Sequence, residues 1–225
     1  MNEQKPEKID HKSSTLDVHS IFDTIQGEGP FSGESAIFIR LAGCNLQCPL
    51  CDTDYTRGRK RLTATDVVEA LTGIGSKAKL AVITGGEPFR QDITQLVENL
   101  LEFGYKVQLE TNGTIFLEGF PYEKVTVVCS PKTPKIHSKL APHVSAFKYV
   151  LSSGYVDYDY IPIKVLGLGY DTSVHKPKEG VKVYVQPCDS KHSVLNKANL
   201  ETCIGAVKEM GYTLNLQIHK IIGVE

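Results

Sequence analysis

The chain has 225 residues, and its 25 basic and 26 acidic residues leave a formal net charge of −1 at pH 7. This balance gives no general electrostatic attraction to nucleic acid or to an anionic membrane, so it favours small-molecule or protein partners. No apolar run reaches the length of about 18 residues that a membrane span needs, and residues 1–16 lack the apolar stretch of a signal peptide. The sequence therefore predicts a cytoplasmic protein.

Residues 1–16 are polar and charged with almost no apolar periodicity, which predicts a disordered N-terminal leader. Residues 17–225 are predicted to form one domain, because their length suits a single core. Short apolar runs then alternate with segments of helical period. The predicted strands lie within residues 36–42, 79–84, 105–113, 125–129, 146–151, 181–185 and 212–219. The predicted helices lie within residues 63–74, 91–104 and 194–210.

Several predicted strands, such as LAVIT and VTVVC, are nearly continuous runs of apolar, β-branched residues. Such runs are typical of parallel strands that are covered on both faces. The pattern predicts an α/β fold with a parallel sheet or barrel. Residues 152–180 are rich in Gly, Tyr, Asp and Pro, which predicts an irregular excursion of a kind that is often functional, and its role stays open.

Three of the six cysteines, Cys44, Cys48 and Cys51, form one C-x3-C-x2-C stretch directly after a predicted strand. In a reducing compartment such a cluster points to metal ligands rather than to disulfides. A zinc site would need a distant fourth ligand such as His137 or His219. Three thiolates also suit an iron-sulfur cube with one open iron, and plain buried thiols are the third interpretation. The remaining cysteines are interpreted as buried small side chains: Cys129, Cys188 and Cys203.

The cysteine spacing after a first strand resembles the signature of the radical S-adenosylmethionine enzymes. This resemblance implies a partial, open parallel (β/α) barrel and a 4Fe-4S cluster held by the three cysteines. It also implies S-adenosylmethionine chelated to the open iron and cleaved to a 5′-deoxyadenosyl radical. The residue before the last cysteine, often aromatic in that family, is Leu50 here, and we expect it to cover the cluster or the adenine edge. The alternatives are a glycyl-radical-enzyme activase, which acts on a protein substrate, and a non-catalytic zinc-binding module.

A second motif, TGGEP, runs from Thr84 to Pro88 at the end of a predicted strand. Alone it is compatible with an ordinary turn, although its two glycines permit close backbone approach and Glu87 offers an acceptor for an ammonium group. By resemblance, Gly86 and Glu87 hold the amino group of the cofactor. The resemblance places a further set of residues along the other side of the cofactor: Ser130, Pro131, Lys132, Gln186, Pro187, Cys188 and Asp189.

A third feature precedes the cysteines, where QGEG at residues 26–29 is followed by Arg40 inside a predicted strand. QGEG could be an ordinary turn, and Arg40 could be the partner of an ordinary buried ion pair. However, an arginine on an apolar strand also suits bidentate recognition of a carboxylate. The chain is similar here to one lyase subfamily, which contracts the ring of 6-carboxy-5,6,7,8-tetrahydropterin to 7-carboxy-7-deazaguanine with release of ammonia, on the route to queuosine. That similarity covers most of the chain after the leader. It implies a set of substrate contacts: Ile25, Gln26, Gly27, Arg40 and Thr84.

The same resemblance assigns Thr53 as a ligand of Mg²⁺, an ion that prefers oxygen ligands and keeps water or substrate oxygens around it. Glu110 is a further candidate acid of the pocket, and Asp52 and Asp54 are interpreted as residues that flank the magnesium site. His219 matches a family ending, although a histidine at a strand end has the same sequence signal. The subfamily also implies a homodimer and a flavodoxin or ferredoxin as electron donor.

Overall fold

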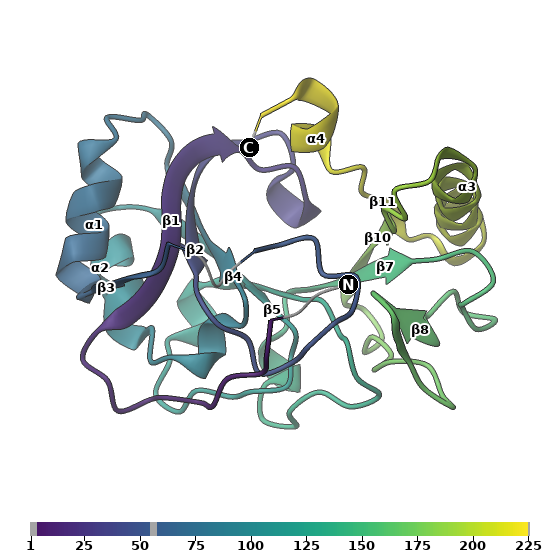
Figure 1. Cartoon of the computed structure of the whole chain (residues 1–225), viewed down its shortest axis with the longest axis horizontal. Helices are drawn as coiled ribbons and strands as arrows, with labels where there is room; N and C mark the ends of the chain where they lie inside the picture. The colour runs from purple at the N-terminus through teal and green to yellow at the C-terminus, as the bar shows by residue number, and fades with distance from the viewer. Residues whose placement is uncertain (1–3, 55–57, 225) are drawn as a thin grey trace.

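A computed structural model of the chain describes residues 4–54 and 58–224. Within these residues one nine-stranded sheet has the order β11-β10-β7-β6-β5-β4-β2-β1-β3 (Figure 1). Its strands are β1 (Leu16–Ile25), β2 (Ser35–Leu41), β3 (Lys60–Leu62), β4 (Leu80–Gly85), β5 (Lys106–Thr111), β6 (Thr126–Cys129), β7 (Ala146–Leu151), β10 (Lys182–Pro187) and β11 (Thr213–Leu214). The α-helices are α1 (Ala64–Gly73), α2 (Thr94–Glu102), α3 (Ser193–Met210) and α4 (Ile218–Ile222). Short 3-10 helices are η1 (Gly29–Phe31), η2 (Pro88–Arg90), η3 (Tyr122–Lys124) and η4 (Ala141–His143).

Seven strands of the sheet run parallel to their neighbours and follow chain order: β2, β4, β5, β6, β7, β10 and β11. This sequential order is that of a (β/α) barrel, and here it stays open, because β3 and β11 form two separate edges. The predicted partial barrel is therefore confirmed. The hairpin partner β1, which pairs antiparallel with both β2 and β3, was not predicted as a strand.

Local signals in the sequence fix the helices. Thr63 caps α1 by accepting a hydrogen bond from the backbone N–H of Asp66, whose carboxylate accepts in turn from the backbone N–H of Thr63. The carboxylate of Asp92 accepts from the backbone N–H of Thr94 at the start of α2. Helix α3 ends at Gly211, which has a left-handed φ of 71°. Figure 1 shows α1 and α2 near the β1–β3 edge of the sheet and α3 near the β10–β11 edge.

The two faces of the sheet differ in polarity. Alternate strand residues such as Ile37, Ile39 and Leu41 of β2 belong to the large apolar core that includes the buried faces of α1 and α2. The residues between them face the interior of the barrel, where a smaller apolar cluster of Ala36, Leu80 and Val82 lies below polar side chains. A strand places successive side chains on opposite faces, so one strand serves both environments.

The structure departs from the prediction at the last predicted strand. Within residues 212–219 only Thr213–Leu214 form a strand, and the chain then turns into the short helix α4, so the prediction of a longer last strand is wrong. Residues 152–180 contain turns and the small hairpin of β8 (Lys164–Val165) and β9 (Leu168–Gly169). Residues 4–15 make backbone hydrogen bonds to the body of the protein, while the domain boundary at residue 17 stays a prediction.

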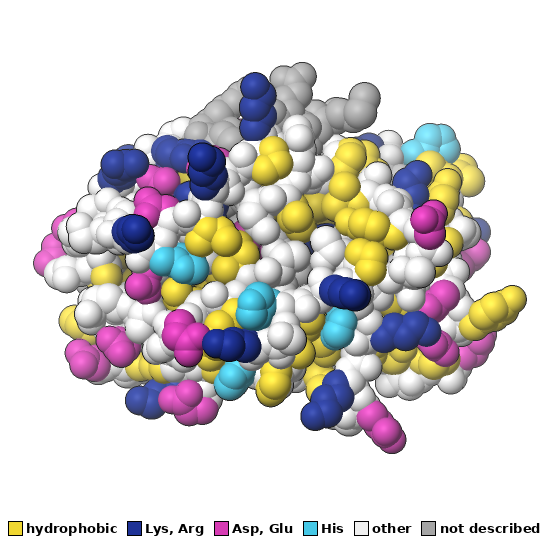
Figure 2. All heavy atoms as spheres, turned by 90° about the horizontal axis from the view of Figure 1, so that it is seen from below, with side chains coloured by type: hydrophobic (Ala, Val, Ile, Leu, Met, Phe, Trp, Pro, Cys, Tyr) yellow, Lys and Arg dark blue, Asp and Glu magenta, His cyan; other side chains and the backbone are white. Residues whose placement is uncertain are grey.

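Among the described residues, no helix has both the length and the apolar character that a membrane crossing requires. Figure 2 shows acidic and basic side chains interspersed over one face of the molecule, in line with the near-zero net charge.

Candidate active site

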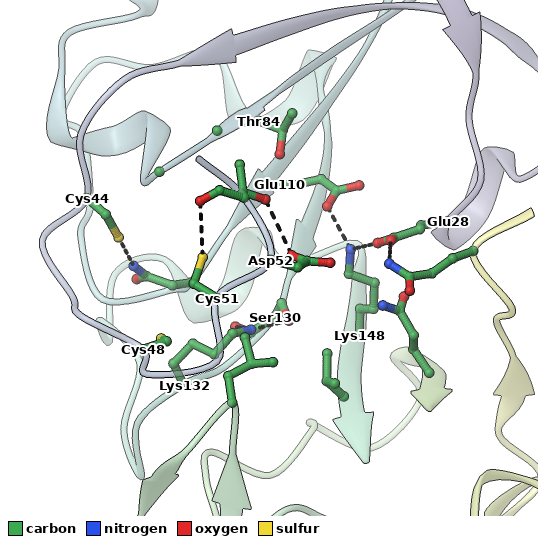
Figure 3. Close-up of a pocket in the computed structure, with 18 of the residues that line it drawn as sticks. Glu28, Cys44, Cys48, Cys51, Asp52, Thr84, Glu110, Ser130, Lys132 and Lys148 are labelled. Carbon is green, nitrogen blue, oxygen red and sulfur yellow. Dashed lines mark hydrogen bonds and ion pairs between the residues drawn. The ribbon is translucent and has the colours of Figure 1, made fainter. Parts of the chain in front are cut away.

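A cavity of about 380 Å³ opens at the carboxyl ends of the parallel strands. Side chains reach it from the loops after β2, β4, β6 and β10 and from the inward-facing positions of β2, β5 and β7 (Figure 3). Parallel strands bring the loops that follow them to one edge of the sheet, which is where barrel enzymes place their chemistry. Motifs that lie far apart in the sequence thus meet at one site.

The three cysteines of the loop after β2 all line this cavity. Cys44 and Cys48 are buried and Cys51 is half-buried, and all three are free thiols. Burial raises the pKa of Cys44 to about 12 and also raises the pKa values of Cys48 and Cys51, so their thiolate forms need a cation to compensate them.

The donor set fits an iron-sulfur cluster. Across residues 4–54 and 58–224, no three His, Cys, Asp or Glu side chains are grouped closely enough to chelate a single metal ion. All three thiols line the same cavity, and in an iron-sulfur cube each thiolate binds a different iron, so no shared single-ion site is needed. His137, a candidate fourth zinc ligand, stacks on Phe116 with ring centroids 5.5 Å apart and does not line the cavity.

The TGGEP turn lies against the cysteine loop, but its acid, Glu87, is buried and does not line the cavity. The backbone N–H of Glu87 donates to the carbonyl oxygen of Gly43 at 2.9 Å. Its fully buried carboxylate accepts hydrogen bonds from the Thr111 hydroxyl at 2.7 Å and from the backbone N–H groups of Asn112 at 2.7 Å and Phe89 at 3.1 Å. Burial outweighs these hydrogen bonds and raises the pKa of Glu87 to about 7.

Glu87 therefore orients the end of β5 next to the cysteines. The side-chain amide of Asn112 donates to the side-chain oxygen of Asn45 at 3.0 Å, inside the cysteine loop. Gly86, by contrast, lines the cavity itself, and a β-carbon there would lie 1.9 Å from the carbonyl oxygen of Gly43. Only glycine allows this approach of the two loops.

The segment after β6 contributes a half-buried lysine. Lys132 Nζ donates to the Ser130 hydroxyl at 2.5 Å and to the Ser130 carbonyl oxygen at 2.8 Å. Both residues line the cavity, and Lys132 lies near Cys48. Burial lowers the pKa of Lys132. Four residues from the end of β10 line the same wall: Gln186, Pro187, Cys188 and Asp189.

The predicted substrate residues divide into two groups. Gln26, Arg40 and Thr84 line the cavity, and the guanidinium of Arg40 lies 5.1 Å from the ring centre of Phe22. The other two predicted substrate residues, Ile25 and Gly27, do not line the cavity. Two predicted cofactor residues, Glu87 and Pro131, do not line it either.

A buried ion cluster at the floor of the cavity was missed by the sequence analysis. Lys148 of β7 donates from Nζ to Glu110 Oε2 of β5 at 2.7 Å and also to Glu28 Oε2 (Figure 3). Gln217 holds the other oxygen of Glu28 at 2.6 Å. Burial raises the pKa of Glu28, but the charge and hydrogen bond of Lys148 outweigh it and leave that pKa below its usual value. Burial lowers the pKa of Lys148, but the two carboxylates outweigh it and leave that pKa above its usual value.

The C-terminal residues close one side of the cavity. The backbone N–H of Ile218 donates to the carbonyl oxygen of Gly27 at 3.2 Å, and a β-carbon on Gly27 would lie 1.9 Å from Nδ1 of His219. Lys220 forms an ion pair with Asp52 of the cysteine loop at 2.9 Å. The QGEG turn, the cysteine loop and α4 are thus held together, with Thr53 on the cavity wall beside Asp52.

The remaining cysteines are buried, as predicted. Cys129 and Cys203 are fully buried in the apolar core, and Cys188 is buried as well, although it lines the cavity. Burial raises the pKa of Cys203 to about 12, so this thiol behaves as a small apolar side chain.

Comparisons with known proteins agree with this geometry. Residues 38–126 match the model of the Radical SAM superfamily. A 7-carboxy-7-deazaguanine synthase of Rickettsia prowazekii is 41% identical over 221 residues, which cover 93% of this chain and 89% of that protein. A 7-carboxy-7-deazaguanine synthase of Rhodospirillum rubrum is 36% identical over 219 residues, with 93% of each chain covered. The fold is similar to that of QueE from Escherichia coli, with a TM-score of 0.68 and 24% identity over 90% of this chain and 93% of that one.

The fold and the cysteine loop define a radical S-adenosylmethionine enzyme, whose cofactors are a 4Fe-4S cluster and S-adenosylmethionine. At this identity and coverage, the chain belongs to the 7-carboxy-7-deazaguanine synthase family.

Proposed function

We propose that this protein converts 6-carboxy-5,6,7,8-tetrahydropterin to 7-carboxy-7-deazaguanine with release of ammonia, as a carbon-nitrogen lyase. The product is the compound in the names of its relatives. The observation that carries the proposal is the shared cavity, which is lined by the three cysteines, by Arg40 and by the ion cluster of Lys148.

The cofactor half of the cavity is formed by the loops after β2, β4, β6 and β10. Cys44, Cys48 and Cys51 would hold the cluster, which supplies the electron that cleaves S-adenosylmethionine and starts the radical reaction. The backbone at Gly86 would receive the amino group of S-adenosylmethionine. The opposite wall would be formed by Ser130 to Lys132 and by Gln186 to Asp189, as the family resemblance implies.

The substrate half is formed by inward-facing side chains of the barrel. Arg40 has a planar guanidinium that binds a carboxylate through two parallel hydrogen bonds, which suits the acid group of the substrate. Thr84 and the backbone around Gln26 would position the ring. Glu110, fixed by Lys148, offers carboxylate oxygens to the N–H groups of a pterin.

Thr53 would bind Mg²⁺ together with the substrate carboxylate. Its side chain lies on the cavity wall and its hydroxyl contacts Asp52 at 3.4 Å, so oxygen donors are available on one side of the site. Mg²⁺ keeps water or substrate oxygens as its other ligands, and one protein hydroxyl is therefore sufficient. Omission of Mg²⁺ should lower turnover of the wild type and have little effect on Thr53→Ala.

The proposal includes an electron donor, an oligomeric state and a location in the cell. A flavodoxin or ferredoxin would supply the electron, because the cluster must be reduced once for each cofactor cleavage that starts a reaction. The family resemblance supports a homodimer in the cytoplasm. Light scattering of the purified protein tests the oligomeric state.

The decisive experiment is product identification. The anaerobically reconstituted protein, supplied with a reductant, S-adenosylmethionine and Mg²⁺, should convert the carboxylated pterin to 7-carboxy-7-deazaguanine, detected by mass spectrometry. Cleavage of S-adenosylmethionine without this product would refute the proposal.

The variant Arg40→Ala separates substrate binding from cluster assembly. It should lose most turnover and keep the visible absorption of the cluster, because Arg40 lies on the substrate side of the cavity. Arg61→Ala removes an arginine whose side chain is 77% exposed, and it serves as the matched control. Loss of the cluster in Arg40→Ala would instead indicate a structural role for this arginine.

A further inference from the structure

Residues 4–15, called the N-terminal strap below, run along the cysteine loop. The backbone N–H of Glu7 donates to the carbonyl oxygen of Cys44 at 2.7 Å. The side-chain amide of Gln4 donates to the carbonyl oxygen of Thr53 at 3.0 Å. The strap therefore contacts the loop at its first cluster ligand and again just after its last one.

The carboxylate of Glu7 connects the cysteine loop to the TGGEP turn. Arg59, which follows the cysteine loop, donates to both oxygens of Glu7 at 2.5 and 3.2 Å, the two-pronged geometry of a strong ion pair. Arg90, which follows the TGGEP turn, approaches Glu7 at 3.6 Å. The Arg90 side chain is 5% exposed, so this contact is shielded from water.

Arg90 continues the connection into the backbone. Its Nη2 donates to the carbonyl oxygen of Ala42 at 3.0 Å and to Asp17 at 3.2 Å, and its Nη1 donates to the carbonyl oxygen of Lys8 at 3.3 Å. The backbone N–H of Asp10 donates to the carbonyl oxygen of Arg90 at 2.7 Å. The strap is thus fixed to both loops that the cofactors require.

We propose that the N-terminal strap braces the cysteine loop in the geometry that binds the cluster, and that Glu7 is its main positioning residue. Ordering a flexible residue costs about 1–2 kcal/mol of conformational entropy, so a loop held at both ends before the cluster binds loses less freedom on assembly. A braced loop also opens less often and releases iron more slowly. The inference rests on the cluster of the proposed function and not on its substrate.

The test uses the reconstituted holoprotein and follows loss of the cluster's visible absorption after addition of an iron chelator. Glu7→Ala removes the hydrogen-bond acceptor of Arg59 and an ion-pair partner of Arg90, and it should speed iron release about tenfold, as expected for loss of a partly buried charge-assisted hydrogen bond. Glu118→Ala breaks the exposed ion pair with Lys139, whose side chains are 81% and 63% exposed, and should leave the rate unchanged.

Thermal unfolding of the cluster-free protein separates bracing from general stability. Arg90 keeps Asp17 and two backbone carbonyl oxygens as partners, and the strap contributes no residue to the apolar core, so Glu7→Ala should melt close to the wild type. An unchanged release rate, or a faster rate accompanied by a large fall in melting temperature, would overturn the proposal. If Glu7→Ala does not fold, Arg59→Ala takes its place and must give the same increase. A wild type that assembles no iron-sulfur cluster would refute the proposed function itself.

Discussion

Replacement of Lys148 by methionine should show how much the buried ion cluster contributes to the free energy of unfolding. Methionine keeps the length of the side chain but removes the cation that faces Glu28 and Glu110. The side chains of Lys148, Glu28 and Glu110 are 7%, 14% and 16% exposed, so solvent screens their charges poorly. Removing one partner from a buried ion pair costs about 3–5 kcal/mol, and we expect a loss of this size in the free energy of unfolding at pH 8.

The loss should depend on pH. In the wild type the pKa of Glu28 is lowered, so its stabilising contribution is present above its ordinary pKa of about 4.3 and is lost as the pH falls further. The pKa of Lys148 is raised, so its contribution is present below about pH 10.4 and is lost only at still higher pH. Wild-type stability from this cluster should therefore be constant between about pH 5 and pH 10.

In Lys148→Met, Glu28 keeps the neighbouring groups Glu110, His219 and Gln217 but loses its lysine. Burial then raises the pKa of Glu28, and protonation relieves the repulsion between the two carboxylates. The variant should thus recover part of its stability as the pH falls from 8 to 5.5.

Urea denaturation of the cluster-free protein at pH 8 and pH 5.5 measures both effects. The control Lys106→Met removes a lysine that pairs with Glu34 at 3.1 Å, where the two side chains are 50% and 48% exposed. That change should cost at most about 1 kcal/mol at either pH. A loss below about 1 kcal/mol in Lys148→Met, or an equal loss at both pH values, would show that the cluster is screened and would refute this reasoning.

Three further substitutions test the packing of the site and the core. Gly86→Ala places a β-carbon 1.9 Å from the carbonyl oxygen of Gly43, so the protein should fail to assemble the cluster, and retained iron and sulfide would contradict this. Gly27→Ala places a β-carbon 1.9 Å from His219, which should displace α4 and raise the KM for substrate while cluster content stays normal; an unchanged KM would argue against it. Leu100→Ala creates a cavity at a fully buried position of α2 and should lower the free energy of unfolding by about 2–5 kcal/mol in urea denaturation. A loss well below this range would contradict the prediction.

Much of the cofactor side of the site could be predicted from the sequence, because its residues are close neighbours along the chain. Cys44, Cys48 and Cys51 lie within one loop, and the glycines of TGGEP lie within one turn. The apolar period also predicted the strands and helices that bring these two loops together. The sequence did not predict the partners of the Glu87 carboxylate, since Thr111 ends β5 and Asn112 follows it, both far from Glu87 along the chain.

From local spacing, the sequence by itself predicted the main parallel strands and the helices α1 to α3, and the class of cofactor chemistry followed from the family resemblance of its cysteine loop. Only the tertiary structure revealed the ion cluster in the cavity. Lys148 lies within an otherwise apolar strand, and its partners Glu28 and Glu110 come from distant segments of the chain. The tertiary structure also gave contacts to the N-terminal strap, whose polar composition predicted a disordered leader. The physical reason is the same in both cases. The charges that meet come from segments far apart in the sequence, and only the folded chain brings these segments together.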